Sequence, residues 1–223
     1  MSMGKVIGMG AALAAGLAVA GMAHASVITQ SISYGPNGPV TNPFTQTMDF
    51  NQFNTGLGTL TSVTIQIDDA STGTVEVTNN SSGSSNYTIS LGEQLNLTDS
   101  NSTQLSTFLD QSNSQSHTIA ASGSYTITAT ATGTSPLTTI NSNLSEFIGN
   151  NTIDLTLSGS GVALVSGATP YSASTNSTSS GAVTLDYYYS NPAAVPLPGS
   201  GALALVGGLA LVGRMAIRRR MAH

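Results

Sequence analysis

Few side chains in this sequence have the type and spacing that catalysis requires. The chain contains no cysteine, and beyond residue 25 His117 is its only histidine before His223. A serine or threonine nucleophile needs a base beside it. His117 lies in the polar stretch QSNSQSHTIA, which contains no nucleophile elbow of the type Gly-x-Ser-x-Gly. We therefore interpret His117 as a solvated loop histidine and predict no catalytic triad.

Paired carboxylates are the second kind of chemistry to consider, because glycoside hydrolysis needs two of them facing across a cleft. Asp68 and Asp69 are adjacent in the sequence, so in a β-strand their side chains would point to opposite faces. The remaining acidic residues are too scattered along the chain to be paired from sequence. We therefore predict no catalytic residues and a protein that is not an enzyme.

One stretch has the alternating oxygen side chains of a calcium loop. Asp99, Asn101 and Thr103 alternate, and Asp110 stands at the last position of a 12-residue loop. Gln104, however, occupies the position where an EF-hand needs glycine, and no flanking helices are evident. We predict neither a defined metal site nor a cofactor, and only weak, nonspecific binding of divalent ions.

Charge is divided along the chain in a way that the net value of -5 conceals. All ten acidic residues lie between Asp49 and Asp186, so residues 26–191 contain no Lys or Arg and no internal salt bridge with either. Such a segment cannot neutralise phosphate, which excludes nucleic acid as a partner. The basic residues all lie in the two terminal segments: Lys5, Arg214, Arg218, Arg219 and Arg220.

The elements that would position these side chains are β-strands. In FTQTMDF (44–50) and VTIQI (63–67) large apolar residues alternate with polar ones, as in half-buried strands. Turn-forming clusters at 79–86 and 158–161 separate such runs, and 172–181 is predicted to be a flexible loop. The pattern predicts an all-β fold, an antiparallel β-sandwich over residues 26–191. Further alternating runs occur at 75–77, 87–91, 125–131, 153–157 and 183–189.

Two short stretches have helical rather than strand spacing. STQLSTFLD (102–110) places Leu105, Phe108 and Leu109 three and four residues apart. NLSEFI (143–148) repeats this spacing behind an Asn143-x-x-Glu146 capping pattern. We expect each stretch to form a helical turn or two that closes an open end of the sandwich.

The first 25 residues have the features of a secretory signal peptide. Lys5 precedes an apolar run from Val6 to Ala23, and Ala23-His24-Ala25 supplies the small-residue cleavage site. Polar, strand-like sequence begins immediately afterwards. We predict cleavage after Ala25 and export of the remaining chain.

The C-terminal end combines a linker with a proline motif (192–200), an apolar segment (201–217) and a basic tail (218–223). The uninterrupted apolar stretch from Gly201 to Gly213 would span about 20 Å as a helix, less than the roughly 30 Å of a hydrocarbon layer. The stretch becomes long enough if Arg214 snorkels toward the lipid headgroups. We therefore predict a transmembrane helix over 201–217, with Arg218, Arg219 and Arg220 in the cytoplasm.

This three-part ending resembles the PEP-CTERM family of bacterial sorting signals. Val195-Pro196-Leu197-Pro198, followed by Gly199, stands where the family usually has Val-Pro-Glu-Pro, as in its VPLPA-type variants. The resemblance implies recognition by an exosortase, a membrane protease of Gram-negative envelopes. The same letters allow an alternative, because Leu197 to Gly201 resembles the sortase signal Leu-Pro-x-Thr-Gly with Ser200 in place of threonine.

The body resembles the choice-of-anchor E domain of bacterial surface proteins. The similar blocks are ITQSISYGPN, NPFTQTMDFNQFNTGLGTLTSVTIQI, FIGNNTIDLTLSGSG and GAVTLDYYY, and the resemblance covers nearly all of residues 27–189. The resemblance implies an exported, anchored domain and brings no catalytic residues with it.

Together these features predict a cell-envelope surface protein with a structural or matrix-associated role. We expect it to be exported, to be anchored in the inner membrane by the C-terminal helix, and to reach the cell surface or extracellular matrix after processing. Its expected partners are the inner membrane, an exosortase-type protease and exopolysaccharide. The alternatives are a sortase-anchored adhesin and a secreted carbohydrate-binding module, for which alternation leaves only Tyr188 of the Tyr187–Tyr189 cluster exposed.

Overall fold

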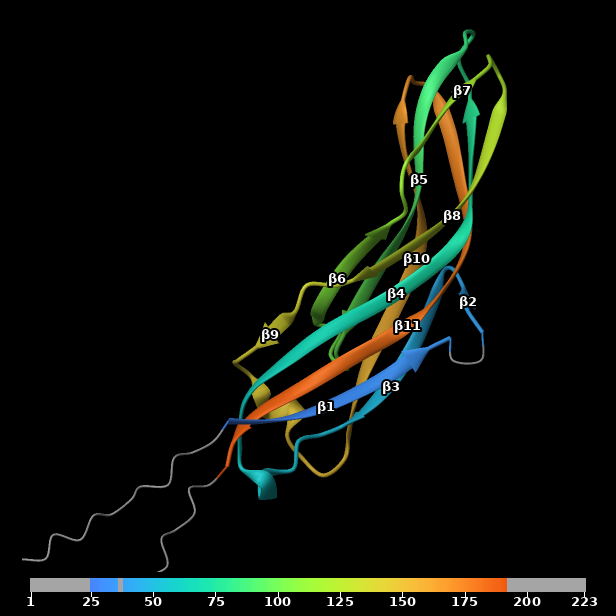
Figure 1. The fold of residues 1–223 in the computed structure, drawn as a ribbon. Coiled ribbons are helices and arrows are strands. Elements are labelled where there is room, and N and C mark those ends of the chain that lie inside the picture. Colours follow the sequence, from blue (N-terminus) through green and yellow to red (C-terminus); the bar gives the residue numbers. More distant parts are fainter. Residues whose placement is uncertain (1–24, 36–37, 192–223) are drawn as a thin grey trace, which may run out of the picture. The chain divides into compact units, whose positions relative to one another are not determined.

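A computed structural model describes residues 25–35 and 38–191 of the chain, which we call the body (Figure 1). Within these ranges no helix has both the length and the apolar character needed to cross a membrane. The signal peptide predicted for residues 1–25 lies outside the described residues except for Ala25. The linker, transmembrane helix and basic tail predicted over 192–223 lie outside them entirely.

The body consists of two β-sheets in a sandwich-like arrangement, and all pairs of neighbouring strands are antiparallel. Sheet A has the order β1-β11-β4-β8, with β2 beside β11 and β9 beside β4. Its strands are β1 (Ala25–Tyr34), β2 (Val40–Thr41), β4 (Thr59–Asn79), β8 (Ser124–Thr134), β9 (Thr138–Ile140) and β11 (Tyr171–Ser190).

Sheet B has the order β3-β10-β5-β6, with β7 beside β5. The two short 3-10 helices of the body are η1 (Thr55–Leu57) and η2 (Leu144–Phe147). The strands of sheet B are β3 (Phe44–Asn51), β5 (Ser85–Thr98), β6 (Gln104–Gln111), β7 (Gln115–Ile119) and β10 (Thr152–Gly167).

The predicted all-β sandwich is confirmed, and the alternating runs lie in strands. In β3, for example, Met48 and Phe50 are buried while Thr47 and Asp49 are exposed. The runs at 63–67 and 75–77, however, belong to the single strand β4. Period-two alternation succeeds here because one face of each sheet packs against the other sheet and the second face meets water.

Three local predictions were wrong. Residues 104–111 form strand β6 rather than a helical turn, since the free edge of β5 pairs with them from Gly92 to Thr98. The loop predicted at 172–181 belongs to β11 and pairs along β4. Hydrogen bonds between strands join backbone groups, so a segment rich in Ser and Thr can form them as readily as an apolar segment can. The predicted turn at 158–161 lies inside β10, where Gly159 and Gly161 leave room for side chains of neighbouring strands.

The second predicted helical stretch is confirmed as η2, which buries Phe147 against the core. The capping box predicted for it does not form. Asn143 has a left-handed backbone conformation, with φ at 54°, and its side chain makes no capping hydrogen bond. The turn predicted at 79–86 is confirmed in its central part, between the end of β4 and the start of β5.

The hydrophobic core is divided into two clusters along the body. The larger cluster contains Phe50, Ile65, Phe147 and Tyr187 and adjoins the end where β1 starts and β11 finishes, which we call the base. The smaller cluster contains Val75, Tyr87 and Ile127. It adjoins the opposite end, where β4 turns into β5, which we call the tip (Figure 1).

Candidate functional site

Nearly all of the sequence-predicted site residues lie outside the described part of the chain. These are Ala23 of the cleavage site, the sorting motif Val195, Pro196, Leu197, Pro198 and Gly199, and the basic residues Arg214, Arg218, Arg219 and Arg220. Ala25 alone is described. It is the first residue of β1 and the cross-strand partner of Ser190, the last residue of β11.

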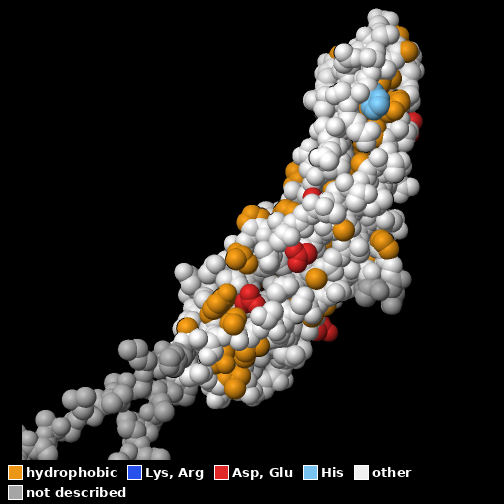
Figure 2. All heavy atoms as spheres, in the orientation of Figure 1, with side chains coloured by type: hydrophobic (Ala, Val, Ile, Leu, Met, Phe, Trp, Pro, Cys, Tyr) orange, Lys and Arg blue, Asp and Glu red, His pale blue; other side chains and the backbone are white. Residues whose placement is uncertain are grey.

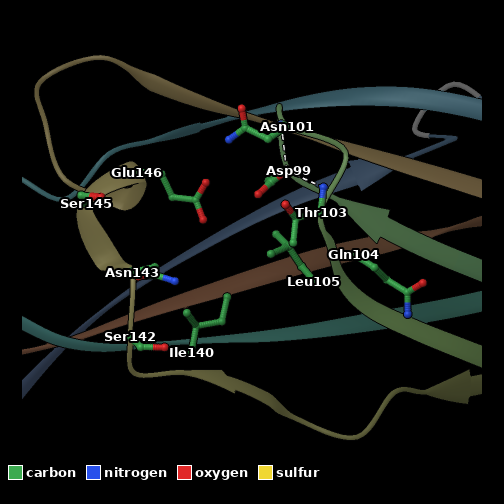
Figure 3. A pocket seen from close by; sticks show the side chains of 10 residues that line it. All are labelled: Asp99, Asn101, Thr103, Gln104, Leu105, Ile140, Ser142, Asn143, Ser145 and Glu146. Carbon is green, nitrogen blue, oxygen red and sulfur yellow. Dashed lines mark hydrogen bonds between the residues drawn. The ribbon is translucent and has the colours of Figure 1, made fainter.

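The described residues contain one open pocket with two carboxyl groups. It has a volume of about 460 Å³ and lies between the β5–β6 turn and the segment that leads from β9 into η2 (Figure 3). Asp99 and Glu146 point toward each other across it. The other lining residues are mostly polar and include no aromatic side chain: Asn101, Thr103, Gln104, Leu105, Ile140, Ser142, Asn143 and Ser145.

Local backbone structure fixes Asp99 in this pocket. Its Oδ1 accepts hydrogen bonds from the backbone N–H groups of Asn101, at 2.8 Å, and Thr103, at 2.7 Å. Such bonds are typical of an Asp that stabilises its own turn. Glu146 has a raised pKa, because it is partly desolvated and because it lies beside the Asp99 carboxylate. The Glu146 carboxyl group therefore keeps its proton to a higher pH than an isolated glutamate does.

The arrangement does not match either chemistry considered from the sequence. Asp68 and Asp69, the adjacent pair considered for glycoside hydrolysis, point to opposite faces of β4, the first exposed and the second buried. Asp110 lies away from the pocket, buried on the inward face of β6, so the calcium loop considered for residues 99–110 does not form. Among the described residues no group of three or more His, Cys, Asp or Glu side chains could hold a metal ion.

His117 occupies a strand rather than the polar loop predicted for it. It lies in β7, pairs with Tyr87 and stacks on Tyr125 with ring centroids 3.9 Å apart. Tyr125 is itself among the exposed hydrophobic residues. Such a histidine supports packing near the tip of the body.

The tyrosine cluster at the end of β11 follows the predicted alternation. Tyr187 is fully buried and its hydroxyl donates to the backbone oxygen of Asn51 at 3.0 Å. Tyr189 packs against the core, and Tyr188 is exposed. As predicted, Tyr188 is the one aromatic ring of the three that faces solvent.

A second group of polar side chains lies inside the sandwich, between the two apolar clusters. We call it the polar belt. Asp69 enters from β4 in sheet A, while Glu93 on β5 and Asp110 on β6 enter from sheet B. The full set is Tyr34, Asn42, Asp69, Ser71, Glu93, Asp110, Ser177 and Ser179.

The strand register explains why these side chains meet. Glu93 and Asp110 are cross-strand partners of β5 and β6. Asp69 is paired with Gly133 on β8, and a Cβ atom added to Gly133 would lie 2.9 Å from Oδ1 of Asp110. Glycine at position 133 therefore leaves the space that the Asp110 carboxyl group occupies. Similarly, a Cβ atom on Gly159 would lie 2.7 Å from Oε1 of Glu93.

Only some of the polar atoms in the belt have hydrogen-bond partners. The Tyr34 hydroxyl donates to Oδ1 of Asp69. Asn42 Nδ2 donates to Oε2 of Glu93 at 2.6 Å, and it also lies 2.8 Å from the Ser177 hydroxyl and 2.9 Å from that of Ser179. Five buried side-chain oxygens of the described residues have no partner, and all belong to the belt: Asn42 Oδ1, Asp69 Oδ2, Ser71 Oγ, Glu93 Oε1 and Asp110 Oδ2.

Burial and mutual repulsion hold the belt carboxyl groups toward their neutral forms. Desolvation raises the pKa of Asp69 to about 6, although the hydrogen bond from Tyr34 opposes the shift. Desolvation, followed by the charge of Asp69, raises the pKa of Glu93 to about 7. Burial also raises the pKa of Asp110, and the pKa of Tyr34 is raised by burial and by its bond to Asp69.

The belt was missed from the sequence, although the sequence contains a signal for it. The inward positions of β4 read Ile65, Ile67, Asp69, Ser71, Gly73, Val75 and Val77. Those of β5 read Tyr87, Ile89, Leu91, Glu93, Leu95 and Leu97. A carboxylate at a position that alternation assigns to the core is the observation that could have located it.

Comparisons with known proteins add little to this description. No protein-family model matches the chain, and no curated protein matches it. A structure of the Gx strain of infectious bursal disease virus is 17% identical over 86% of this chain and 42% of the viral chain, with a TM-score of 0.21. A VP2 subviral particle of the same virus is 15% identical over 85% and 42%, with a TM-score of 0.16. The chain thus spans less than half of these viral chains, and likeness at this level carries no argument about function.

Proposed function

We propose that this chain is an exported cell-envelope surface protein with a structural or matrix-associated role, anchored in the inner membrane by a helix over 201–217. Its C-terminal signal, Val195 to Gly199 followed by the basic tail, is the substrate of an exosortase-type protease. After processing, the body reaches the cell surface or the extracellular matrix, where exopolysaccharide is its partner. The similarity of its ends to PEP-CTERM signals and of its body to choice-of-anchor E domains motivates this proposal.

One observation carries the proposal. Basic residues are confined to the terminal segments, and both segments join the body at its base, where Ala25 stands opposite Ser190. A signal peptide and an anchor joined to the same end of a domain leave its other end free. Basic residues beside the two apolar terminal segments are the arrangement that the positive-inside bias favours.

The tip is the part of the body that such an anchor would present outward. Three turns meet there, since Asn79 N donates to the Gly123 oxygen at 2.9 Å and Asn80 N to the Pro170 oxygen at 3.0 Å. On the face shown in Figure 2, apolar side chains form small groups and no Lys or Arg appears on the described residues. A hydrated surface of this kind suits contact with a polysaccharide matrix.

A non-catalytic role is part of the proposal. His117 stacks on Tyr125, and no hydrogen bond between its side chain and a serine or threonine is found among the described residues. Asp68 and Asp69 lie on opposite faces of β4 and cannot face each other across a cleft, as a glycosidase requires. These features support a binding or structural body.

Cell fractionation tests the proposed sorting. The wild-type protein and a variant with Arg218, Arg219 and Arg220 changed to Ser are followed through membrane, surface and medium fractions of the native host. We expect the variant to lose membrane retention and processing, seen as a changed distribution and apparent mass. Unchanged localisation and mass would refute the sorting signal. The control changes three exposed carboxylates of the body: Asp49→Asn, Glu76→Gln and Asp154→Asn.

Two further variants separate the kinds of processing enzyme. Pro196→Ala changes the proline motif, and Ser200→Ala changes the residue on which the sortase alternative depends. Loss of processing in Pro196→Ala alone supports an exosortase. Loss in Ser200→Ala alone supports a sortase-anchored adhesin.

The pocket between Asp99 and Glu146 favours glycan binding as a second function. Carboxylate and amide groups can accept and donate hydrogen bonds to sugar hydroxyls, and the pocket offers both. A glycan array probed with wild type, Glu146→Gln and Tyr188→Ala distinguishes the sites. Binding that is lost only in Glu146→Gln assigns it to the pocket, whereas loss in Tyr188→Ala assigns it to the exposed ring.

A further inference from the structure

We propose that the polar belt is a proton-dependent junction, which holds the two sheets together while its carboxyl groups carry protons and loosens when they ionise. This inference is independent of the proposed function. It concerns the cohesion of the body and rests on where three carboxyl groups lie in the fold.

The geometry places the belt where the sheets must adhere. Asp69 comes from sheet A, and Glu93 and Asp110 come from sheet B, so charge on all three acts across the interface between the sheets. Glu93 has no exposed surface, and Asp110 and Asp69 are only 4% and 5% exposed. Apolar clusters lie on both sides of the belt. Water therefore cannot hydrate these groups without separating the sheets.

No Lys or Arg among the residues that the structure describes compensates them. The elements that pack around the belt contribute one further titratable group, the Tyr34 hydroxyl at the end of β1. The segment after β2 contributes Asn42, and β11 contributes Ser177 and Ser179. From β8 and β10 the belt meets glycines, at 133, 159 and 161, and Asp68 on β4 faces outward. Three ionised carboxylates would thus face one another with hydroxyl and amide groups as their only donors.

The unpartnered oxygens are consistent with protonated carboxyl groups. Asp69 Oδ2, Glu93 Oε1 and Asp110 Oδ2 each lack a donor among the described residues. A protonated carboxyl group replaces one such acceptor with a hydroxyl donor and removes the charge. Burial of the belt therefore costs the least free energy when its carboxyl groups are neutral.

The sign of the pH dependence follows from the raised pKa values. Asp69 and Glu93 titrate near 6 and near 7 in the folded body, and Asp110 also above its ordinary value. In the unfolded chain these groups have pKa values of about 4. The folded state thus binds the protons more tightly, so its stability is greatest below about pH 4 and is lost as the pH rises toward about 7. A shift of two units in one group lowers the folding constant about 100-fold.

The test compares unfolding of the full chain, in a neutral detergent with EDTA, between about pH 4 and about pH 8. The wild-type folding constant should fall by at least about 100-fold over this range. The variant Asp69→Asn/Glu93→Gln/Asp110→Asn should lose most of that dependence, leaving the contribution of Glu146. The variant Asp49→Asn/Glu76→Gln/Asp154→Asn removes three exposed carboxylates and should behave as wild type.

A wild-type folding constant that does not change with pH would overturn the proposal, as would a belt variant that retains the full dependence. Adding calcium at about pH 8 distinguishes an effect of proton binding from an effect of a bound metal ion. If it restores wild-type stability but not that of the belt variant, the belt is a cation site and the proposal is wrong.

Hydrogen exchange on the wild type keeps the proposal testable even if the belt variant does not fold. Amide exchange in β6 and in residues 69–71 of β4 should accelerate between acidic and alkaline pH, after correction for intrinsic exchange rates. Residues 153–157 of β10, beside the larger apolar cluster, should change less. Equal acceleration in both regions would refute a junction located at the belt.

Discussion

Ala25 and Ser190 are cross-strand partners, the first residue of β1 opposite the last residue of β11. The register continues without interruption to Tyr34 opposite Gly181. Removal of the segment up to Ala25 would therefore leave the ladder intact from Ser26 onward. The predicted cleavage point lies directly after the first residue of β1.

Blocking signal-peptide cleavage should produce a longer protein with the same body. Ala23→Leu removes a small residue that the peptidase needs at the cleavage site. We expect intact mass spectrometry of this variant to show residues 1–25 still attached. Ala20→Leu, which exchanges one apolar residue for another inside the apolar run, should be cleaved as wild type. A mature N-terminus at Ser26 in Ala23→Leu would contradict the predicted site.

Removing the tyrosine hydroxyl from the belt should destabilise the body in a pH-dependent way. The Tyr34 hydroxyl donates to Asp69 and lowers the pKa of that carboxyl group against the effect of burial. Tyr34→Phe therefore raises the pKa further and withdraws a donor that favours the ionised form. We expect urea unfolding to show a loss of about 1–3 kcal/mol at about pH 8 and a smaller loss at about pH 4.

The matched control is Tyr188→Phe, because Tyr188 is exposed and its hydroxyl makes no hydrogen bond with the described residues. Its stability should equal that of wild type at both pH values. An equal loss in Tyr34→Phe at the two pH values would show that the hydroxyl acts through packing and not through the charge of Asp69.

The sequence was sufficient to predict the fold class but not every element. Alternation located β3 and the apolar halves of β4, β5, β10 and β11, because burial on one face leaves a period of two. It failed for β6, where the spacing of Leu105, Phe108 and Leu109 fits a helix equally well. In the structure Phe108 faces inward and Leu109 is exposed, and this depends on pairing with β5. The free edge of β5 that pairs with this segment is set by the tertiary fold, and the spacing of apolar residues within the segment does not encode it.

The polar belt is a second feature that could be predicted only in part from the sequence. That Asp69 and Glu93 occupy inward positions could be inferred from alternation. That Asp110 stands opposite Glu93 depends on the register between β5 and β6, and that Asp69 joins them depends on how the sheets face each other. Neither register nor sheet packing can be derived from the spacing of acidic residues along the chain.

Truncation of Phe147 should cost much of the stability of the base. Its ring is fully buried beside Tyr187, with centroids 6.5 Å apart, and its backbone oxygen accepts from Phe53 N at 2.7 Å. Phe147→Ala would leave a cavity that η2 cannot fill, and we expect a loss of about 3–5 kcal/mol by urea unfolding. Leu137→Ala, at a residue that is 60% exposed, should stay within about 0.5 kcal/mol of wild type. A small effect of Phe147→Ala would contradict the role of η2 as a plug of the core.

A methyl group at position 73 should disturb the strands that carry the belt. Gly73 lies on β4 opposite Ser177 of β11, and an added Cβ atom would come within 2.6 Å of the Ser177 Cα. Because the contact is with backbone, no side-chain rotation relieves it, and β11 must move together with Ser177. We expect Gly73→Ala to lower the free energy of unfolding by about 1–3 kcal/mol in urea. Gly83→Ala, in a turn with no atom within 4 Å of the new Cβ, should change it by less than about 0.5 kcal/mol. Equal stability of the two variants would mean that β4 and β11 do not approach as closely at this point as the register requires.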